Sequence, residues 1–231
     1  MKKIDLHIHT LSTISDADFC FDIDILDSYV RTRKIDVIAI TNHNLFNLEQ
    51  YKTISSRLAY ITVLPGIEIN IGENCGHILV ISSSANIQDF SQRCLEVQQK
   101  ITQQHDYLSL DRYLIIPHYE KKPSVDKRIL RDLHDVIYCG EVSSVKKFIY
   151  CQKDNDDLTP VLFSDFRACK GNVSFPFQQT FLDIDEISIN SIKLCLKDKS
   201  KVSLTESEGH SMFFALPDLK LSTGLNVIIG G

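Results

Sequence analysis

The chain has 231 residues, 43% of them hydrophobic, and a formal net charge of −5 at pH 7. This length and apolar content allow one large core, or one domain with part of a second. The negative charge argues against a broad basic face that wraps nucleic acid, so that any nucleic-acid contact is expected to be small and local.

Strand-like and helix-like segments alternate over the first 170 residues or so. Strands are expected at residues 4–8, 37–40, 61–69, 77–81, 113–116, 136–142 and 161–163. Helices are expected between them, at residues 23–34, 48–58, 87–103, 125–133 and 145–152. Such alternation predicts right-handed βαβ units and a parallel sheet, and seven strands are nearly enough to close a barrel. The predicted fold class is therefore α/β, a distorted TIM-like (β/α)7 barrel.

The character of the chain changes after about Gly171. A strand is expected at residues 179–184, a short amphipathic helix at 189–196 and a polar stretch at 197–211, and the chain ends Gly-Leu-Asn-Val-Ile-Ile-Gly-Gly231. A strand that stops at Gly-Gly resembles the lead-in to a phosphate-binding loop, whose Gly-Lys-Ser/Thr is absent here. We predict two units, a catalytic barrel at 1–171 and a short α+β extension at 172–231.

The cysteines and the N-terminus indicate a cytoplasmic protein. The seven cysteines form no Cys-x-x-Cys pair and mostly lie in apolar stretches, as expected for reduced core residues. The N-terminal segment carries Asp5 and two histidines, which a signal peptide would not. No apolar run approaches the roughly 20 residues that cross a bilayer, so no membrane contact is expected.

Five of the eight histidines lie beside short apolar runs. In Asp5-Leu6-His7-Ile8-His9 the alternation of a strand points both imidazoles the same way, so that they can bind one ion. The motifs Thr41-Asn-His43, Pro65-Gly-Ile-Glu68, Gly76-His77, Pro117-His118 and Ser164-Asp165 place further imidazoles and carboxylates beside strand ends.

A single histidine is more often a hydrogen-bonded core residue, but this set together indicates a multinuclear metal centre. Zn²⁺ and Mn²⁺ accept mixed imidazole and carboxylate ligands, and iron is a further candidate. Glu68 is the expected bridging ligand, because a carboxylate can bind two ions and an imidazole cannot. His77 stands at the start of its strand, so that this strand is expected to run antiparallel or to be reached by a loop.

The ordered motifs resemble the PHP (polymerase and histidinol phosphatase) superfamily of metal-dependent phosphoesterases, over about residues 1–170. The resemblance implies a distorted seven-stranded barrel with up to three ions at the strand ends. It implies a first ion bound by His7, His9, Glu68 and Asp165, and a second bound by Glu68, His77 and His118. A third ion would take His43 and Asp16, together with a histidine two places after Asp165.

Two residues depart from the family at this third ion. Arg167 stands where the third histidine is expected. Either the site is lost, leaving a two-metal or damaged enzyme, or the guanidinium takes the place of the ion and binds a substrate phosphate. Asn42 stands where relatives carry aspartate, and we expect it to orient His43 without adding charge, which makes His43 a less basic ligand.

For other polar residues near the predicted strand ends, the sequence does not indicate a definite role in the site. Glu141 is either an outer partner of the site or a solvated carboxylate. The lysines could steer a phosphate, but a solvated surface is the preferred interpretation for Lys121, Lys122, Lys146 and Lys147. No partner spacing assigns a role to His105, His134 or His210.

The resemblance implies hydrolysis of a phosphate ester, with Glu68, Asp165 and Arg167 as catalytic residues. One group of the superfamily is fused N-terminally to an ATPase of the SMC or ABC type, and residues 179–196 and 224–231 resemble the corresponding pieces. This implies an ATPase domain in the same polypeptide, a homodimer formed through it as an option, and a nuclease acting on nucleic acid. The alternatives are a small-molecule phosphomonoesterase of the histidinol-phosphatase type and a catalytically silent docking module.

Overall fold

The computed structural model describes residues 1–206 except 17, 73–74, 101–111, 154–157 and 172–173. The first half contains β1 (Lys2–His9), α1 (Ile23–Arg33), β2 (Val37–Ile40), α2 (Leu48–Arg57), β3 (Thr62–Asn70), β4 (His77–Ile81), η1 (Ser84–Asn86) and α3 (Ile87–Lys100). The second half contains β5 (Leu114–Glu120), α4 (Lys127–Asp132), β6 (Cys139–Val142), α5 (Val145–Lys153), β7 (Thr159–Val161), β8 (Phe166–Arg167), β9 (Thr180–Leu182), α6 (Ile189–Leu196), η3 (Lys199–Lys201) and β10 (Val202–Ser203).

The strands form one mixed sheet in the order β10-β9-β1-β2-β3-β4-β5-β6-β7, with β8 paired to β1. β1, β2 and β3 are parallel, and so are β5, β6 and β7. β4 runs antiparallel to both of its neighbours, which is the first of the two arrangements expected from the position of His77.

The sheet curls into a nearly closed barrel. After β7, the Leu162 amide donates to the Thr180 hydroxyl oxygen of β9 at 2.9 Å, and that hydroxyl donates to the Leu162 carbonyl at 2.9 Å. β9 in turn pairs with β1. The gap between β7 and β1 is therefore filled by β9 rather than by direct pairing, and the predicted α/β barrel is confirmed in this mixed form.

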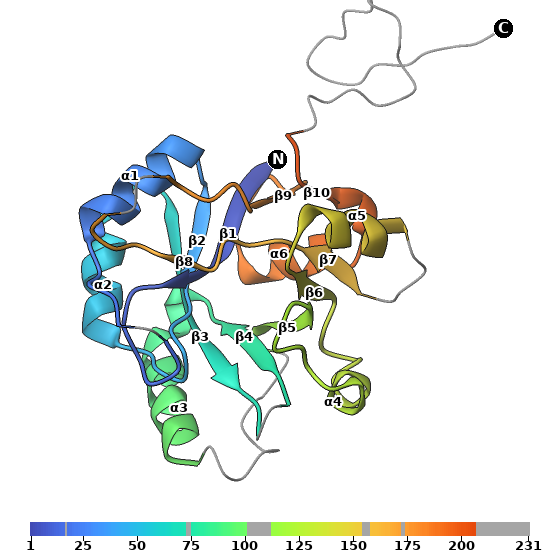
Figure 1. Cartoon of the computed structure of the whole chain (residues 1–231), viewed down its shortest axis with the longest axis horizontal. Coiled ribbons are helices and arrows are strands. Elements are labelled where there is room, and N and C mark those ends of the chain that lie inside the picture. Colours follow the sequence, from blue (N-terminus) through green and yellow to red (C-terminus); the bar gives the residue numbers. More distant parts are fainter. Residues whose placement is uncertain (17, 73–74, 101–111, 154–157, 172–173, 207–231) are drawn as a thin grey trace, which may run out of the picture.

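Two apolar clusters pack the sheet against its helices. Leu26 and Val30 of α1, with residues of α2 and α3, pack on one side. Phe148 of α5 and Ile192 of α6 belong to the cluster on the other side. Figure 1 shows α1, α2 and α3 along one side of the sheet, with α5 and α6 at the opposite side. α1 begins at the N-cap Asp22, whose side chain accepts from the amides of Asp24 and Ile25.

Element boundaries differ from expectation mainly between β5 and β7, and β5 continues to Glu120, past its expected end at residue 116. The strand expected from residue 136 begins at Cys139, because the amides of Val136 and Ile137 bond the Leu133 carbonyl in a turn. The strand expected at 161–163 lies at Thr159–Val161. Leu162 therefore lies just beyond β7, where its backbone bonds Thr180 of β9.

Residues 180–204 extend the same sheet and core. β9 pairs antiparallel with β1 and β10 with β9, and Ile189, Ile192, Cys195 and Leu196 of α6 are buried in the cluster that also contains Leu6. The division at residue 171 stays a prediction. The Gly-Gly run at 230–231 lies outside the described residues.

The seven cysteines are all within the described residues and are present as thiols. Cys94, Cys139, Cys151 and Cys195 are buried, as expected for core residues, whereas Cys20 is exposed. Among the helices that the structure describes, none combines the length and apolar character needed to cross a membrane.

Candidate metal centre

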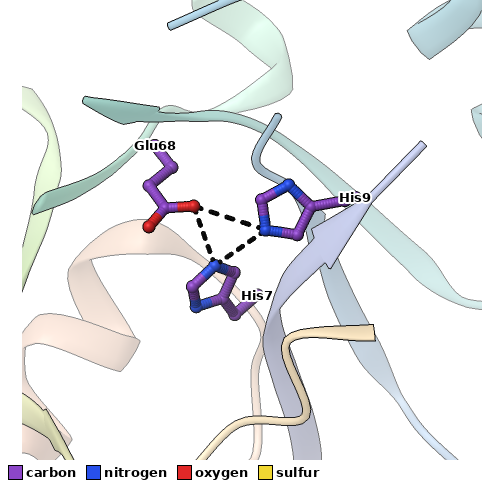
Figure 2. A group of neighbouring side chains, drawn as sticks. All are labelled: His7, His9 and Glu68. Carbon is purple, nitrogen blue, oxygen red and sulfur yellow. Dashed lines mark hydrogen bonds and ion pairs between the residues drawn. The ribbon is translucent and has the colours of Figure 1, made fainter. Parts of the chain in front are cut away.

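His7 and His9 lie next to each other on β1 and are fully buried. Their Nε2 atoms are 3.0 Å apart. Oε2 of Glu68, from β3, lies 3.1 Å from His7 Nε2 and 3.3 Å from His9 Nε2. Figure 2 shows the two rings and the carboxylate converging on one point. Strand alternation thus brings the two imidazoles together, as the sequence predicts.

Glu68 presents a different oxygen to each of two groups of histidines. Besides His7 and His9, Oε2 faces His43 Nδ1 at 3.1 Å. Oε1 lies 2.6 Å from His77 Nδ1 and 3.4 Å from His118 Nε2. His43 is the third residue after β2, and an isolated bridge between His43 and Glu68 continues the β2–β3 pairing. This is the geometry expected of a bridging carboxylate.

Asp165 completes the group around His7 and His9. Its Oδ1 lies 3.1 Å from His9 Nε2 and 3.5 Å from His7 Nε2. Its φ of 53° is in the left-handed region, which aspartate tolerates better than most residues. The backbone conformation is therefore a local constraint, of the kind found at functional sites.

Buried Asp5 holds the loop that carries Asp165. Its carboxylate accepts from the Ser164 amide at 3.1 Å, the Ser164 hydroxyl at 2.5 Å and the Tyr29 hydroxyl at 2.5 Å. Burial raises the pKa of Asp5 to about 6, although these three donors favour its ionised form. Asp5 therefore holds the Asp165 loop in place through its hydrogen bonds with Ser164.

The residues predicted for a third ion lie together with Arg167. Asp16 Oδ2 is 3.5 Å from His9 Nδ1, and Asp16 Oδ1 is 3.7 Å from His43 Nε2. Arg167 Nε donates to Asp16 Oδ1 at 2.8 Å, and its Nη1 donates to Asp165 Oδ1 at 2.9 Å. β8 pairs with β1 so that Arg167 lies opposite His9. A guanidinium thus contacts two carboxylates at the edge of the third group.

The interpretation of Asn42 as a partner of His43 is wrong. Asn42 Oδ1 accepts from the amides of Thr10 and Leu11, at 2.6 and 2.8 Å. The side-chain amide donates to the Thr10 hydroxyl at 3.2 Å. A neutral amide suits this position because it fixes the loop after β1 with both its acceptor and its donor.

Glu141 and Lys121 both lie in the site, where the sequence pattern leaves the role of Glu141 open and favours a solvated surface for Lys121. Glu141 is fully buried on β6 and contacts His7 Nδ1 at 2.9 Å and His118 Nε2 at 3.2 Å. The preferred interpretation of Lys121 as solvated surface is wrong, because its side chain is 11% exposed and its Nζ lies 2.8 Å from Glu141 Oε1. By contrast, Lys122 and Lys146 are exposed.

Facing charges and burial shift the pKa values of the ionisable side chains in the site. Burial disfavours ionisation of Glu68, but the facing His7 outweighs it and holds the pKa of Glu68 well below its usual range. The same balance lowers the pKa of Glu141, through His7 and Lys121. Burial opposes protonation of His7, yet Glu141 raises its pKa to about 10. The pKa of His118 is lowered, chiefly by burial.

The donor set fits divalent metal ions. Within the described residues, four buried side chains carry ligand atoms without a hydrogen-bond partner, namely His9 Nδ1, Asp16 Oδ2, His43 Nδ1 and both ring nitrogens of His118. Buried polar atoms normally find partners, so that these atoms fit ligands of ions. Mixed imidazole and carboxylate donors suit zinc, manganese and iron.

Four groups of three residues can each hold an ion, because the ligand atoms within each group lie within 4.8 Å of one another. Several residues belong to more than one group. The groups are His7–His9–Glu68, His7–His118–Glu141, His9–Asp16–His43 and His43–Glu68–His77. The predicted second group of Glu68, His77 and His118 meets through Glu68 Oε1, while His118 also belongs with Glu141. The buried clusters are consistent with more than one ion.

Comparison with known proteins identifies the fold. No family model matches the chain, and no curated protein matches it. The crystal structure of a two-domain protein from Bacteroides vulgatus, containing a predicted PHP-like metal-dependent phosphoesterase, is similar with a TM-score of 0.57 and 16% identity. The similarity covers 87% of this chain and 63% of that one, so that the chain spans less than two thirds of its length. The fold is PHP-like.

Two further structures are more distant. A candidate metal-dependent phosphoesterase from Bifidobacterium adolescentis has a TM-score of 0.45 at 10% identity, over 84% of this chain and 95% of that one. An amidohydrolase from Chromobacterium violaceum with bound sulfate has a TM-score of 0.44 at 14% identity, over 75% of this chain and 92% of that one.

Proposed function

We propose that this chain is a metal-dependent phosphoesterase whose centre binds two divalent ions. Glu68 supports the proposal most directly, because its two oxygens face two groups of buried or half-buried imidazoles from β1, β4 and β5 and the end of β2. The PHP-like fold supports the same conclusion, because the similar crystal structure is described as containing a predicted phosphoesterase of that type.

The balance of charge favours an anionic substrate. The carboxylates of Asp16, Glu68, Glu141 and Asp165 are partly neutralised by the two fixed cations Lys121 and Arg167. Two divalent ions would leave about two positive charges in excess. A phosphate ester with one or two negative charges fits such a site.

The residues of the site have different roles in the proposed reaction. Divalent ions, when bound, lower the pKa of water and stabilise charge on phosphate oxygens. His7, His9 and Asp165 would hold one ion, and Glu68 would link it to the ion beside His77 and His118. The side chain of Arg167 is 33% exposed, and its planar guanidinium can bind a phosphate oxygen while it keeps Asp16 and Asp165 in place.

For the substrate we propose a phosphodiester of nucleic acid, in a polypeptide that also carries an ATPase domain. The support is the resemblance of the C-terminal sequence to ATPase-fused members of the superfamily, and it is an argument by analogy. A panel of single-stranded and double-stranded DNA and RNA, compared with small phosphomonoesters, distinguishes this proposal from a phosphatase. Ion binding without hydrolysis of any phosphate ester would instead support the docking module.

The direct test is hydrolysis of bis(p-nitrophenyl) phosphate in the presence of Mn²⁺ or Zn²⁺. We expect turnover by the wild-type chain and none by Glu68→Ala or Asp165→Ala, because each variant removes a ligand that no neighbour replaces. Glu49→Ala is the matched control, since Glu49 is exposed on α2. Full activity of either site variant would refute the assignment.

A further inference from the structure

Lys121 is a buried cation that the predicted ligand set does not include. It follows β5, and a register shift in the β5–β6 pairing between His118 and Glu120 directs it toward the centre. Its Nζ lies 2.8 Å from Glu141 Oε1, 3.1 Å from Asp165 Oδ2 and 2.9 Å from His7 Nδ1. One ammonium group therefore touches three residues of the metal centre.

The protonation of His7 decides which of these contacts are hydrogen bonds. Nδ1 of His7 faces both Glu141 and Lys121, and it cannot donate to the first while accepting from the second. Nε2 points to His9 and Glu68, so that its lone pair must be free if it binds an ion. The ring proton then sits on Nδ1 and is donated to Glu141.

The protons of Lys121 go to the carboxylates in that case. Glu141 Oε1 and Asp165 Oδ2 are the two acceptors within reach. Asp165 Oδ1 faces His7 and His9, so that Lys121 holds the outer oxygen of Asp165 and leaves the inner oxygen for the ion. Through Glu141 the same ammonium group fixes the tautomer and ring orientation of His7.

We propose that Lys121 is a positioning residue of the metal centre, which sets the orientation of His7 and Asp165 through its contacts with Glu141 and Asp165. The inference rests on the proposed function only in that the centre binds divalent ions, and it does not require a particular substrate. It extends the site beyond the residues that contact ions directly.

Cobalt(II) titration of the full chain tests the inference, because the visible absorption of bound cobalt reports its coordination. In Lys121→Met we expect a changed absorption spectrum and an affinity at least tenfold weaker than in the wild type. If Lys121 contributed only its charge, loss of a cation would strengthen the binding of a divalent ion. Weaker binding therefore indicates positioning, and unchanged or stronger binding overturns the proposal.

Two further variants complete the design. Lys122→Met removes the neighbouring exposed ammonium and should leave affinity and spectrum unchanged. The double variant Lys121→Met with Glu141→Gln removes one charge of each sign, so that no unpaired buried carboxylate is left at Glu141 to prevent folding. Positioning predicts that its cobalt affinity stays low, since Asp165 Oδ2 still lacks its contact with Lys121, whereas wild-type affinity and spectrum would overturn the proposal.

The test separates this inference from the proposed function. A wild-type chain that binds no cobalt would overturn both. A wild-type chain that binds cobalt and hydrolyses phosphate esters, together with a Lys121→Met variant of unchanged spectrum and affinity, would overturn only the role of Lys121.

Discussion

Asp165 is the residue at which the ion ligands and the fixed cations meet. Oδ1 faces His9 and also accepts from Arg167, while Oδ2 faces Lys121. Burial would keep this carboxyl neutral, but its hydrogen bond with His9 and the charges of His7 and Lys121 lower its pKa. Asp165 is therefore ionised and held in one orientation before any ion binds.

Arg167 supplies a permanent positive charge beside Asp16, and we expect it to exclude an ion from the His9–Asp16–His43 group. Arg167→His removes this cation and offers a neutral imidazole ligand instead. Elemental analysis should find one more ion per chain in Arg167→His than in the wild type. The exposed Arg128→His variant is the control and should match the wild type. Three ions in the wild type, or no gain in Arg167→His, would contradict this role.

Asp5 predicts a specific pH dependence of stability. Its pKa is raised from 3.8 to about 6 in the folded state, chiefly by burial. The folded chain therefore holds this proton more tightly, and the resulting stabilisation is complete below about pH 4 and is lost as the pH rises through 6. A rise in pKa of this size corresponds to about 3 kcal/mol in the free energy of unfolding.

The comparison of wild type with Asp5→Asn isolates this contribution. The free energy of unfolding, measured with urea between pH 4 and 7, should fall for the wild type relative to Asp5→Asn as the pH rises. Carboxylates with lowered pKa, such as Glu68, give the opposite slope, but they are common to both proteins and cancel. A difference that does not change with pH would count against the buried, raised-pKa carboxyl.

Among single residues, the sequence predicts only some of the side chains that meet in the centre. His7 and His9 were predictable because strand alternation is strict over two residues, and the residues at parallel strand ends meet at one edge. The position of Lys121 was not predictable, because the register shift in the β5–β6 pairing after His118 breaks the alternation of side chains along the strand. Glu141 needed the identity of the neighbouring strand, which local pattern does not supply.

At the scale of elements, the turn before β4 determines where His77 lies. Gly76 has a φ of 102°, and a Cβ at this position would lie 2.5 Å from backbone atoms of Ser124 and Val125. This turn therefore packs directly against the segment after β5. β4 begins at His77, immediately beyond this contact.

Gly76→Ala should be markedly more destabilising than Gly171→Ala. Gly171 also has a positive φ, of 96°, but nothing lies within 4 Å of a Cβ placed there. The strained backbone alone costs about 1–2 kcal/mol, and the backbone clash at Gly76 adds roughly 1–3 kcal/mol. Urea unfolding of both variants measures the difference. Equal losses would show that the close packing at Gly76 is absent.

Element types were predictable where apolar periodicity was long, as in α1 and β3, and their ends were less so. β6 begins three residues later than expected because the Leu133 carbonyl binds two amides in a turn. The direction of β4 was one of two arrangements expected from a single residue, since a ligand at the start of a strand reaches the common edge if the strand is reversed or if a loop carries it there. β8, with two residues, is too short for any periodic signal.

At the scale of the whole molecule, the barrel is completed by a segment that follows residue 171. β9 and β10 continue the sheet from β1, and α6 buries Ile192 and Leu196 in the core shared with β1. Closure of a sheet depends on pairing between distant strands, which composition and local motifs do not encode. The α/β barrel and the strand at residues 179–184 were therefore predictable, whereas the place of that strand in the gap of the barrel was not.

We propose that Glu68 bridges two ions in a buried centre. Elemental analysis of the purified chain, alongside Glu68→Ala and the exposed control Glu49→Ala, tests it most directly. We expect two divalent ions per chain in the wild type and in the control, and fewer than one in Glu68→Ala, because both groups of imidazoles lose their shared carboxylate. A wild-type chain without bound ions, or a Glu68→Ala variant that keeps both, would contradict the account.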